Sequence, residues 1–288
     1  MGKRKNRLSL SGKVVWITGA SSGIGEQLSY QFASLGASLI LSARNLQKLE
    51  IVGQKLTQYN ISTRILPLDL EQLDELPGKV AEASSCFGKI DYLVNNAGIG
   101  LRDFALDTDL STDQKIMTIN YFGPMVLTKA ILPQMLQRGS GQIVVINSLS
   151  GKYGVPRTSS YAASKHALQG FFETLRSEIA GSGVHITIIV PGIIQTRITA
   201  HALKGDGELF GRVEKTFQRA YPVEQAAEKI VRAVLKRKEE AFVGGMEGFT
   251  LYLNRISPWL LRRFIRSHPI KKWRKFKQRF SFKQNTKT

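Results

Sequence analysis

The sequence predicts a doubly wound α/β fold, in which a seven-stranded parallel sheet carries helices on both faces and a basic amphipathic tail follows. Short apolar, β-branched runs alternate with amphipathic segments along most of the 288 residues. The apolar runs are nearly continuous, which is typical of strands buried on both faces. A glycine-rich turn directly follows the first run, at the place where such folds bind phosphate groups.

Six strands and six helices can be placed in order. We expect strands at 14–18, 38–42, 61–68, 92–94, 142–147 and 185–190. We expect helices at 24–35, 46–58, 71–87, 112–137, 160–179 and 223–236. Residues 193–221 are the least regular part of the body and follow a strand at the ligand-binding edge of the sheet. We interpret them as a substrate lid, with a plain surface excursion as the alternative.

Composition and charge predict three regions: a basic segment at 1–11, one catalytic α/β domain at 12–248 and a basic amphipathic extension at 249–288. The formal net charge of +19 is concentrated at the two ends, and no acidic residue follows Glu247. The single cysteine, Cys86, allows no intramolecular disulfide and favours a reducing compartment. The sequence shows neither a transmembrane-length apolar run nor a secretory signal, so we expect a cytoplasmic protein.

The C-terminal extension combines aromatic residues with lysine and arginine. Ser257 and Pro258 predict a helix start there, with serine as the N-cap and proline in the first turn. Apolar residues recur at Trp259, Leu260, Leu261, Phe264, Ile265, Ile270, Trp273, Phe276 and Phe280. An anionic membrane surface is the favoured partner. Packing on the body or on another subunit is the first alternative, and nucleic acid is the second, although no recognition motif for it is present.

The turn between the first strand and the first helix reads Gly19-Ala20-Ser21-Ser22-Gly23-Ile24-Gly25. Its glycines permit tight backbone geometry and the close approach of a pyrophosphate to the helix N-terminus. At the end of the second strand, an acid would bind the ribose 2′-hydroxyl of NAD. The residues there are Ala43 and Arg44, and a planar cation suits a 2′-phosphate. The sequence therefore predicts NADP(H), unless Arg44 is only a solvated surface arginine.

Tyr161 and Lys165 lie four residues apart, on one face of a predicted helix. A free phenol has a pKa near about 10 and is a poor acid or base at neutral pH. A neighbouring ammonium group would lower that pKa and allow the tyrosine to exchange a proton with a carbonyl or alcohol oxygen. Such a pair is common by chance, so it is informative only together with other motifs.

Together these motifs resemble the classical short-chain dehydrogenase/reductase family over about Gly12 to Gly245. The residues that carry the resemblance are Gly19 to Gly25, Asn95-Asn96-Ala97-Gly98, Asn120, Ser148, Tyr161, Lys165 and Pro191-Gly192. Stretches at 15–19, 41–44 and 163–168 are similar to the member-7 branch of the dehydrogenase/reductase group. Membrane-bound animal members of that branch carry an N-terminal hydrophobic anchor, which this sequence does not show. Many NADP(H)-preferring relatives also have a basic residue at the position of Ser22.

The resemblance implies a Rossmann-type fold and a role for each motif residue. Tyr161 would be the acid in reduction and the base in oxidation, and Lys165 would bind the nicotinamide ribose and tune Tyr161. Ser148 would hydrogen-bond the substrate oxygen, and Asn120 would hold a proton-relaying water. The implied cofactor-binding residues are Gly19, Ser21, Ser22, Gly23, Ile24, Gly25, Arg44, Asp69, Leu70, Asn96, Ala97, Gly98, Tyr161, Lys165, Pro191, Gly192, Ile194 and Thr196.

The expected reaction interconverts a carbonyl and an alcohol with NADP(H), and reduction of an apolar steroid-, retinoid- or lipid-like carbonyl is the expected direction. The family resemblance also implies a homodimer or homotetramer, with the helices at 112–137 and 160–180 as the subunit interface. No metal is expected, because the histidines lack ligand spacing. Two alternatives use the same fold without turnover: a nucleotide-sensing binding protein and a membrane-surface adaptor.

Overall fold

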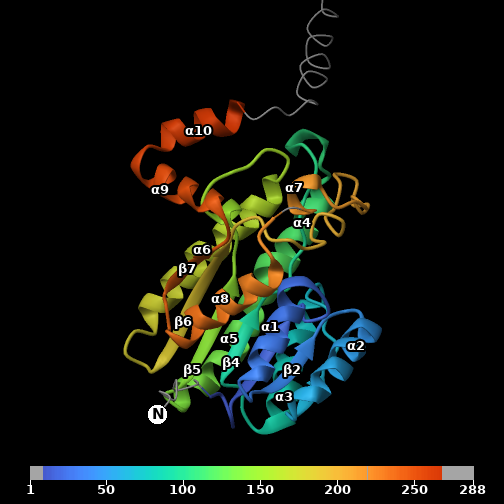
Figure 1. Ribbon diagram of the computed structural model, residues 1–288, viewed down its shortest axis with the longest axis vertical. Coiled ribbons are helices and arrows are strands. Elements are labelled where there is room, and N and C mark those ends of the chain that lie inside the picture. Colours follow the sequence, from blue (N-terminus) through green and yellow to red (C-terminus); the bar gives the residue numbers. More distant parts are fainter. Residues whose placement is uncertain (1–8, 219, 268–288) are drawn as a thin grey trace, which may run out of the picture. The chain divides into compact units, whose positions relative to one another are not determined.

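The computed structural model describes residues 9–218 and 220–267 and contains a seven-stranded parallel sheet (Figure 1). The strand order is β3-β2-β1-β4-β5-β6-β7, which confirms the predicted fold class. The strands are β1 (Val14–Thr18), β2 (Ser38–Ser42), β3 (Thr63–Ile65), β4 (Tyr92–Asn95), β5 (Gly141–Ile146), β6 (Val184–Pro191) and β7 (Glu240–Val243). The chain divides into two compact units, Met1–Gly248 and Phe249–Thr288.

Helices cover both faces of the sheet (Figure 1). In one layer α1 packs against α2 and α8, and in the other α3 packs against α5 and α4 against α6. Their bounds are α1 (Gly23–Ser34), α2 (Leu46–Leu56), α3 (Leu76–Phe87), α4 (Leu110–Met117), α5 (Gly123–Gln137), α6 (Ser159–Glu178) and α8 (Val223–Leu235). A short helix, α7 (Lys215–Gln218), lies within the segment that we expected to be a lid.

The strand order reverses at β1, which pairs with β2 on one side and with β4 on the other. The chain runs outward from β1 through β2 to β3 and then returns to β4. The carboxyl ends of β1 and β4 therefore open a crevice at the switch point, where doubly wound sheets bind their ligands. Beneath it the core is tightly closed, and the fully buried Trp16 donates its indole N–H to Ser42 Oγ at 2.8 Å.

Several boundaries differ from the expected ones. The third strand covers only 63–65, and the third helix begins at Leu76 instead of residue 71. A turn and a 3₁₀ segment, Leu73–Glu75, occupy the residues between them. Pro77 lies in the first turn of α3, where its missing N–H costs nothing, and this favours the later start. The seventh strand had no predicted position, because β7 is a short edge strand whose residues are mostly exposed or half-buried.

The expected long helix at 112–137 is not continuous. A π-helical turn, Thr118–Phe122, separates α4 from α5 and contains Asn120. Such wide turns occur mainly at functional sites, because the extra residue redirects one side chain out of the regular helical positions. Within it, Asn120 is fully buried. The π turn therefore marks this part of the helix as functional before any chemistry is considered.

The second unit contains two described helices, α9 (Phe249–Ile256) and α10 (Pro258–Ser267), which contact each other. The helix start expected at Ser257 and Pro258 is confirmed. The basic residues expected at the N-terminus and the apolar positions Ile270, Trp273, Phe276 and Phe280 lie outside the described residues. Among the residues that are described, no helix is both long and apolar enough to cross a membrane.

Candidate functional site

The glycine turn after β1 is built for close backbone approach. Gly19 and Gly23 have positive φ angles of 67° and 58°, which side chains other than glycine adopt only with strain. A Cβ atom on Gly25 would lie 2.2 Å from the Gly19 carbonyl oxygen. At the N-cap of α1, the side chain of Ser22 makes no capping hydrogen bond. The free N–H groups and the positive end of α1 therefore fit a pyrophosphate.

Thr18 and Asn96 join the carboxyl ends of β1 and β4 beneath this turn. Thr18 Oγ1 accepts hydrogen bonds from the backbone N–H groups of Asn96 and Ala97, both at 3.1 Å. Asn96 Nδ2 donates to the carbonyl oxygens of Thr18 at 2.9 Å and Gly19 at 3.2 Å. The Asn96 amide therefore shapes the crevice by holding the turn. Sequence reasoning missed Thr18, whose one signal is a hydroxyl at the last position of the first strand.

The loop after β6 brings Thr196 to the glycine turn, and the family resemblance implies that both bind the cofactor. The Cβ position of Gly23 is 3.4 Å from Thr196 Cγ2. Ile194 is buried, whereas Gly192 and Thr196 are half-buried, so this loop presents its backbone and one hydroxyl to the crevice. Pro191 is the last residue of β6 and fixes where the loop begins.

Glu247 holds this loop through a hydrogen bond to its backbone, and the sequence analysis did not predict this role. Its Oε1 accepts hydrogen bonds from the backbone N–H groups of Ile193 at 2.8 Å and Gly245 at 3.1 Å. A Cβ atom on Gly192 would lie 2.0 Å from this oxygen, so the missing side chain there admits the carboxylate. Glu247 therefore fixes the Pro191-Gly192 loop. The sequence feature that could have pointed to Glu247 is that it is the last acidic residue of the sequence and lies in a glycine-rich stretch.

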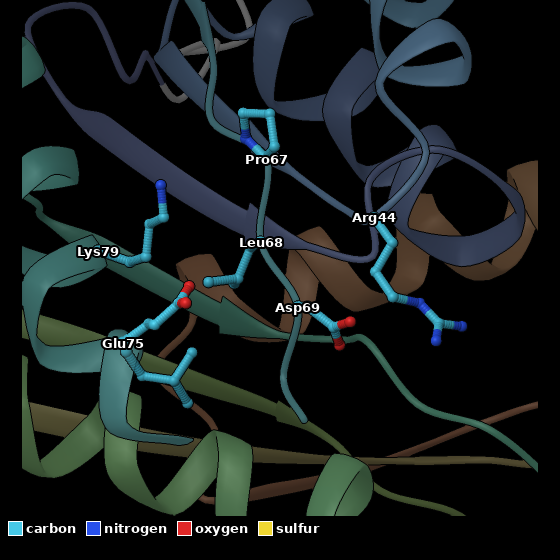
Figure 2. A pocket seen from close by; sticks show the side chains of 7 residues that line it. Arg44, Pro67, Leu68, Asp69, Glu75 and Lys79 are labelled. Carbon is cyan, nitrogen blue, oxygen red and sulfur yellow. The ribbon is translucent and has the colours of Figure 1, made fainter. Parts of the chain in front are cut away.

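Arg44 and Asp69 lie at the far end of the crevice. They help to line a pocket of about 310 Å³, and Figure 2 shows Glu75 and Lys79 on the side opposite to them. Asp69 Oδ1 accepts from the Glu71 backbone N–H at 3.0 Å, which makes a tight turn. The Arg44 side chain is 56% exposed, and its guanidinium group lies 3.6 Å from the Glu71 carboxylate.

Leu70, the neighbour of Asp69, is buried. A Cβ atom on Gly123 would lie 2.9 Å from Leu70 Cβ, so the start of α5 packs directly on this residue. Leu70 is thus held by the body of the fold, and only its backbone is free to face a ligand.

Tyr161 and Ser148 meet at the catalytic end of the crevice. Tyr161 lies in the first turns of α6, and Ser148 caps the 3₁₀ turn Leu149–Gly151 by accepting from the Ser150 N–H at 3.1 Å. The side-chain hydroxyl of Ser148 acts on the Tyr161 phenol and lowers its pKa, although burial raises that pKa overall. A Cβ atom on Gly151 would lie 2.8 Å from the Lys165 carbonyl oxygen. Glycine there lets the turn press against α6 and brings the two hydroxyls together.

Lys165 lies one helical turn after Tyr161 and is only 5% exposed. Its Nζ donates to the Ile146 carbonyl oxygen at 2.9 Å and lies 5.9 Å from the centre of the Tyr161 ring. Burial lowers the pKa of the Lys165 amine from 10.5 to about 8. A strongly perturbed lysine in a crevice indicates a functional site.

The sequence argument expected Lys165 to lower the pKa of Tyr161, but the pKa of the phenol is raised. Burial raises the pKa of the phenol, against the lowering effects of the Ser148 hydrogen bond and the Arg102 charge. The amine of Lys165 is bonded to a backbone carbonyl and faces the ring from 5.9 Å. Desolvation therefore outweighs attraction, and the phenol stays protonated at neutral pH.

The side chain of Asn120 is held by protein groups on every side. Its Nδ2 donates to the Ile99 carbonyl at 2.9 Å and contacts Ser164 Oγ at 3.1 Å, while Oδ1 accepts from the Ile99 N–H at 2.8 Å. Ser164 in turn donates to the Tyr161 carbonyl at 2.8 Å. Both amide N–H groups are therefore used, and the side chain can offer a water only the remaining lone pair of its oxygen. A Cβ atom on Gly98 would lie 3.0 Å from that oxygen and 3.8 Å from Lys165 Nζ.

The expected lid, residues 193–221, is fastened to the loop after β4. The Arg102 N–H donates to the Leu203 carbonyl at 2.9 Å, and its side chain donates to Glu214 at 3.1 Å. Arg157 adds a hydrogen bond to the Arg102 carbonyl at 2.8 Å. Because the charge of Arg102 acts on Tyr161, these contacts of the lid lie close to the catalytic end of the crevice.

Among the described residues, no group of three or more His, Cys, Asp or Glu side chains is placed to hold a metal ion.

The buried amine of Lys165 generates a prediction about stability. In the folded chain its pKa is about 8, against 10.5 when exposed, so between these values the unfolded chain binds more protons. Stability then rises with pH across this window, and at neutral pH the buried charge is destabilising. We expect Lys165→Met to raise the free energy of unfolding at about pH 7 by ~2 kcal/mol, after loss of the Ile146 hydrogen bond. The gain should shrink as the pH rises toward 10.5.

Urea denaturation at about pH 7 and about pH 10 measures this difference. The exposed Lys48, changed to methionine, is the matched control and should shift stability by less than ~0.5 kcal/mol. A Lys165→Met variant less stable than the wild type at both pH values would show that the charge is not destabilising.

A family model described as short chain dehydrogenase matches residues 13–206. A relative from Drosophila melanogaster, dehydrogenase/reductase SDR family protein 7-like, is 38% identical over 262 residues, which cover 89% of this chain and 80% of that protein. An alcohol dehydrogenase from Thermococcus sibiricus, solved with 5-hydroxy-NADP, has a TM-score of 0.70 and 26% identity over 81% of this chain and 97% of its own.

A short chain dehydrogenase/reductase from Burkholderia phymatum, solved in complex with NAD, has a TM-score of 0.78 over 88% of this chain and 96% of its own. At 22% identity this likeness concerns the fold alone. The family model covers more than half of the chain, and the predicted motifs meet around one crevice. The chain therefore belongs to the short-chain dehydrogenase/reductase family of oxidoreductases, within the member-7 branch.

Proposed function

We propose that this oxidoreductase uses NADP(H) and reduces an apolar ketone or aldehyde to the alcohol. The observation that carries the proposal is the buried Lys165 amine, 5.9 Å from the centre of the Tyr161 ring on the same helix, with the Ser148 hydroxyl acting on the Tyr161 phenol. The uncapped start of α1 and the absent side chain of Gly25 fit the pyrophosphate of a dinucleotide. Substrate and cofactor can therefore approach the same crevice from its two ends.

A nicotinamide cofactor held in this crevice would supply a hydride to the carbonyl carbon. In reduction, the Ser148 hydroxyl donates a hydrogen bond to the carbonyl oxygen and orients it toward Tyr161. Tyr161 Oη then gives its proton to that oxygen as negative charge develops there. The phenolate that remains is stabilised by Ser148 and by the charge of Arg102. Asn120 would hold a water that returns a proton to this chain of groups.

The raised pKa of Tyr161 supports reduction as the working direction. Burial keeps the phenol protonated at neutral pH, which is the form that a general acid needs. The same burial would have to be overcome before Tyr161 could act as a base in oxidation.

The preference for NADP(H) rests on Arg44 and on how its carboxylate neighbour is paired. Glu71 lies 3.6 Å from Arg44 but 3.1 Å from Lys115. Lys115 therefore neutralises Glu71 at the shorter distance, and the half-exposed guanidinium group can turn to a 2′-phosphate. With Ser22 in the glycine turn, Arg44 carries most of this recognition.

The rest of the proposal concerns surroundings and assembly. An apolar substrate agrees with the member-7 resemblance and with the apolar surface of the C-terminal extension. We place the enzyme in the cytoplasm, in contact with an anionic membrane surface through that extension. A homodimer or homotetramer would form through α5 and α6. Leu136 on α5 and Phe122 just before α5 are 38% and 39% exposed and would be covered in such an interface.

Tyr161→Phe tests the reductase proposal directly. Removing the acidic hydroxyl should lower kcat by ~10²-fold or more, because a positioned general acid contributes that much. The affinity for NADPH should stay within ~3-fold, since the ring remains. NADPH oxidation is followed by absorbance over a panel of apolar ketones, aldehydes and quinones, with the remote Tyr59→Phe as the matched control. Unchanged turnover in Tyr161→Phe would refute the mechanism, and NADPH binding without turnover of any compound by the wild type would favour the nucleotide-sensing alternative.

Arg44→Ala tests the cofactor preference. Loss of a charge-assisted contact to the 2′-phosphate should lower kcat/KM for NADPH by ~10-fold and leave that for NADH nearly unchanged. Arg64→Ala on the exposed side of β3 is the control, since it removes an equal charge elsewhere. If the ratio of the two kcat/KM values is the same in both variants, Arg44 does not select the cofactor.

Glu247 is a positioning residue, and its two variants should differ. Glu247→Ala leaves the Ile193 and Gly245 N–H groups without their acceptor, so the loop loses order and NADPH affinity should fall by ~10-fold. Glu247→Gln keeps an acceptor oxygen and should recover most of that affinity. Fluorescence titration with NADPH measures both, beside the exposed Glu50→Ala. Equal affinities in all four proteins would exclude a role for Glu247 in holding the loop.

A further inference from the structure

Helix α9 presents apolar side chains on its outer face. Phe249, Tyr252 and Ile256 are 51%, 73% and 83% exposed. Their spacing of three and then four residues places them on one side of the helix. Thr250, which points elsewhere, is buried. The exposed stripe is the reverse of the usual arrangement, in which the apolar face of a surface helix is covered.

Helix α10 has the same character. Leu261 is 1% exposed and faces inward, whereas Trp259, Leu260 and Phe264 are 66%, 46% and 49% exposed. Leu261 is therefore the buried apolar residue of α10, and Trp259, Leu260 and Phe264 expose much of their apolar surface. Of the fifteen large apolar residues that are exposed in the described part of the chain, six lie on these two helices. Such a concentration marks an interaction surface, because isolated exposed apolar residues are normally scattered.

The outer faces of the two helices form one surface. The rings of Phe249 on α9 and Phe264 on α10 lie 6.2 Å apart, edge to face at 76°. Arg263 places its guanidinium group over the Trp259 ring, 6.0 Å from the ring centre. We call this surface, made of Phe249, Tyr252, Ile256, Trp259, Leu260 and Phe264, the hairpin face.

The charge around the hairpin face has one sign. Arg255, Arg262, Arg263 and Arg266 are all exposed, and the sequence after Glu247 contains no acidic residue. Two copies of this surface would repel each other, which disfavours self-association. Nucleic acid would match the charge but offers no cover for six apolar side chains. An anionic bilayer matches both features, since aromatic rings enter the headgroup region while arginines reach the lipid phosphates.

We infer that the hairpin face docks the protein on an anionic membrane surface, with its aromatic rings in the interface and its arginines on the headgroups. This inference rests on the membrane contact proposed above and names the residues that make it, but it is separate from the reductase proposal, because the hairpin face shares no residue with the catalytic crevice. Failure of one would leave the other standing, since turnover is measured in solution and docking on vesicles.

Vesicle co-sedimentation of the full chain tests the docking. Phosphatidylcholine vesicles containing phosphatidylserine should bind the protein, and vesicles of phosphatidylcholine alone should bind it much more weakly. The double variant Tyr252→Ser/Trp259→Ser should lower the partition coefficient by ~10-fold or more. Leu46→Ser/Ile51→Ser is the matched control, because it removes two exposed apolar side chains from α2 instead. Arg262→Gln/Arg266→Gln should lower the partition coefficient by about fivefold for each charge removed. Added salt should also weaken binding to the anionic vesicles.

A second readout separates the hairpin face from the basic residues that follow it. In Trp273→Phe, the tryptophans left are Trp16, which is fully buried, and Trp259. Brominated anionic lipid should quench the fluorescence of Trp259 in this variant. A chain ending at residue 267 should still bind anionic vesicles, although more weakly because it carries less charge.

Three results would overturn the inference. These are wild-type binding to anionic vesicles by Tyr252→Ser/Trp259→Ser, loss of all binding in the chain that ends at residue 267, and no binding of the full chain to anionic vesicles. The last result, together with capture of the wild type by an acidic polypeptide, would assign the hairpin face to a protein partner. Circular dichroism of each variant confirms that it is folded before its binding is compared.

Discussion

The structure of the site depends on keeping the amine of Lys165 out of water. An ammonium group in a protein interior is unfavourable unless polar atoms meet it, and here one backbone carbonyl, that of Ile146, does so at 2.9 Å. That contact requires α6 to lie against the end of β5, and the same closeness brings Ser148 to Tyr161. The glycines at 98 and 151 provide the space, because a Cβ atom at either position would intrude on Asn120, Asn147 or Lys165. The position of the catalytic pair is thus a consequence of tight packing around one buried charge.

The same burial explains why the sequence argument about Tyr161 needed correction. A Tyr and a Lys four residues apart predict an ammonium beside a phenol, and the family resemblance predicts that the lysine tunes it. Spacing along a helix fixes only the face, however, and not where a long side chain ends. The amine turns to the Ile146 carbonyl, so desolvation governs the pKa of the phenol. Ribose hydroxyls of a bound cofactor would give that amine further partners and bring its charge into the proton-transfer path.

What could be predicted from the sequence follows from how local each signal is. The first two strands and the helix at 160–179 have strong apolar patterns, and their observed bounds agree to within a residue. The glycine turn and Thr196 meet as expected, because both follow strands of the same parallel sheet. The π turn at Asn120 has no periodic signature, since a single inserted residue leaves the apolar pattern almost intact. Glu247 could not be identified as a loop support, because the partner that ties it to the loop, the Ile193 backbone N–H group, lies 54 residues away in the sequence.

The C-terminal extension shows that an apolar pattern in the sequence does not tell whether the apolar side chains are buried or exposed. Periodicity in the sequence predicted an amphipathic helix, but an apolar stripe alone does not say whether it is covered by protein. In the structure, the inward position of α10 is taken by Leu261, and the aromatic residues that the pattern also counted as apolar lie outside with the arginines. These outer rings remain available to a second medium, and the one-signed charge around them makes an anionic interface the medium that fits.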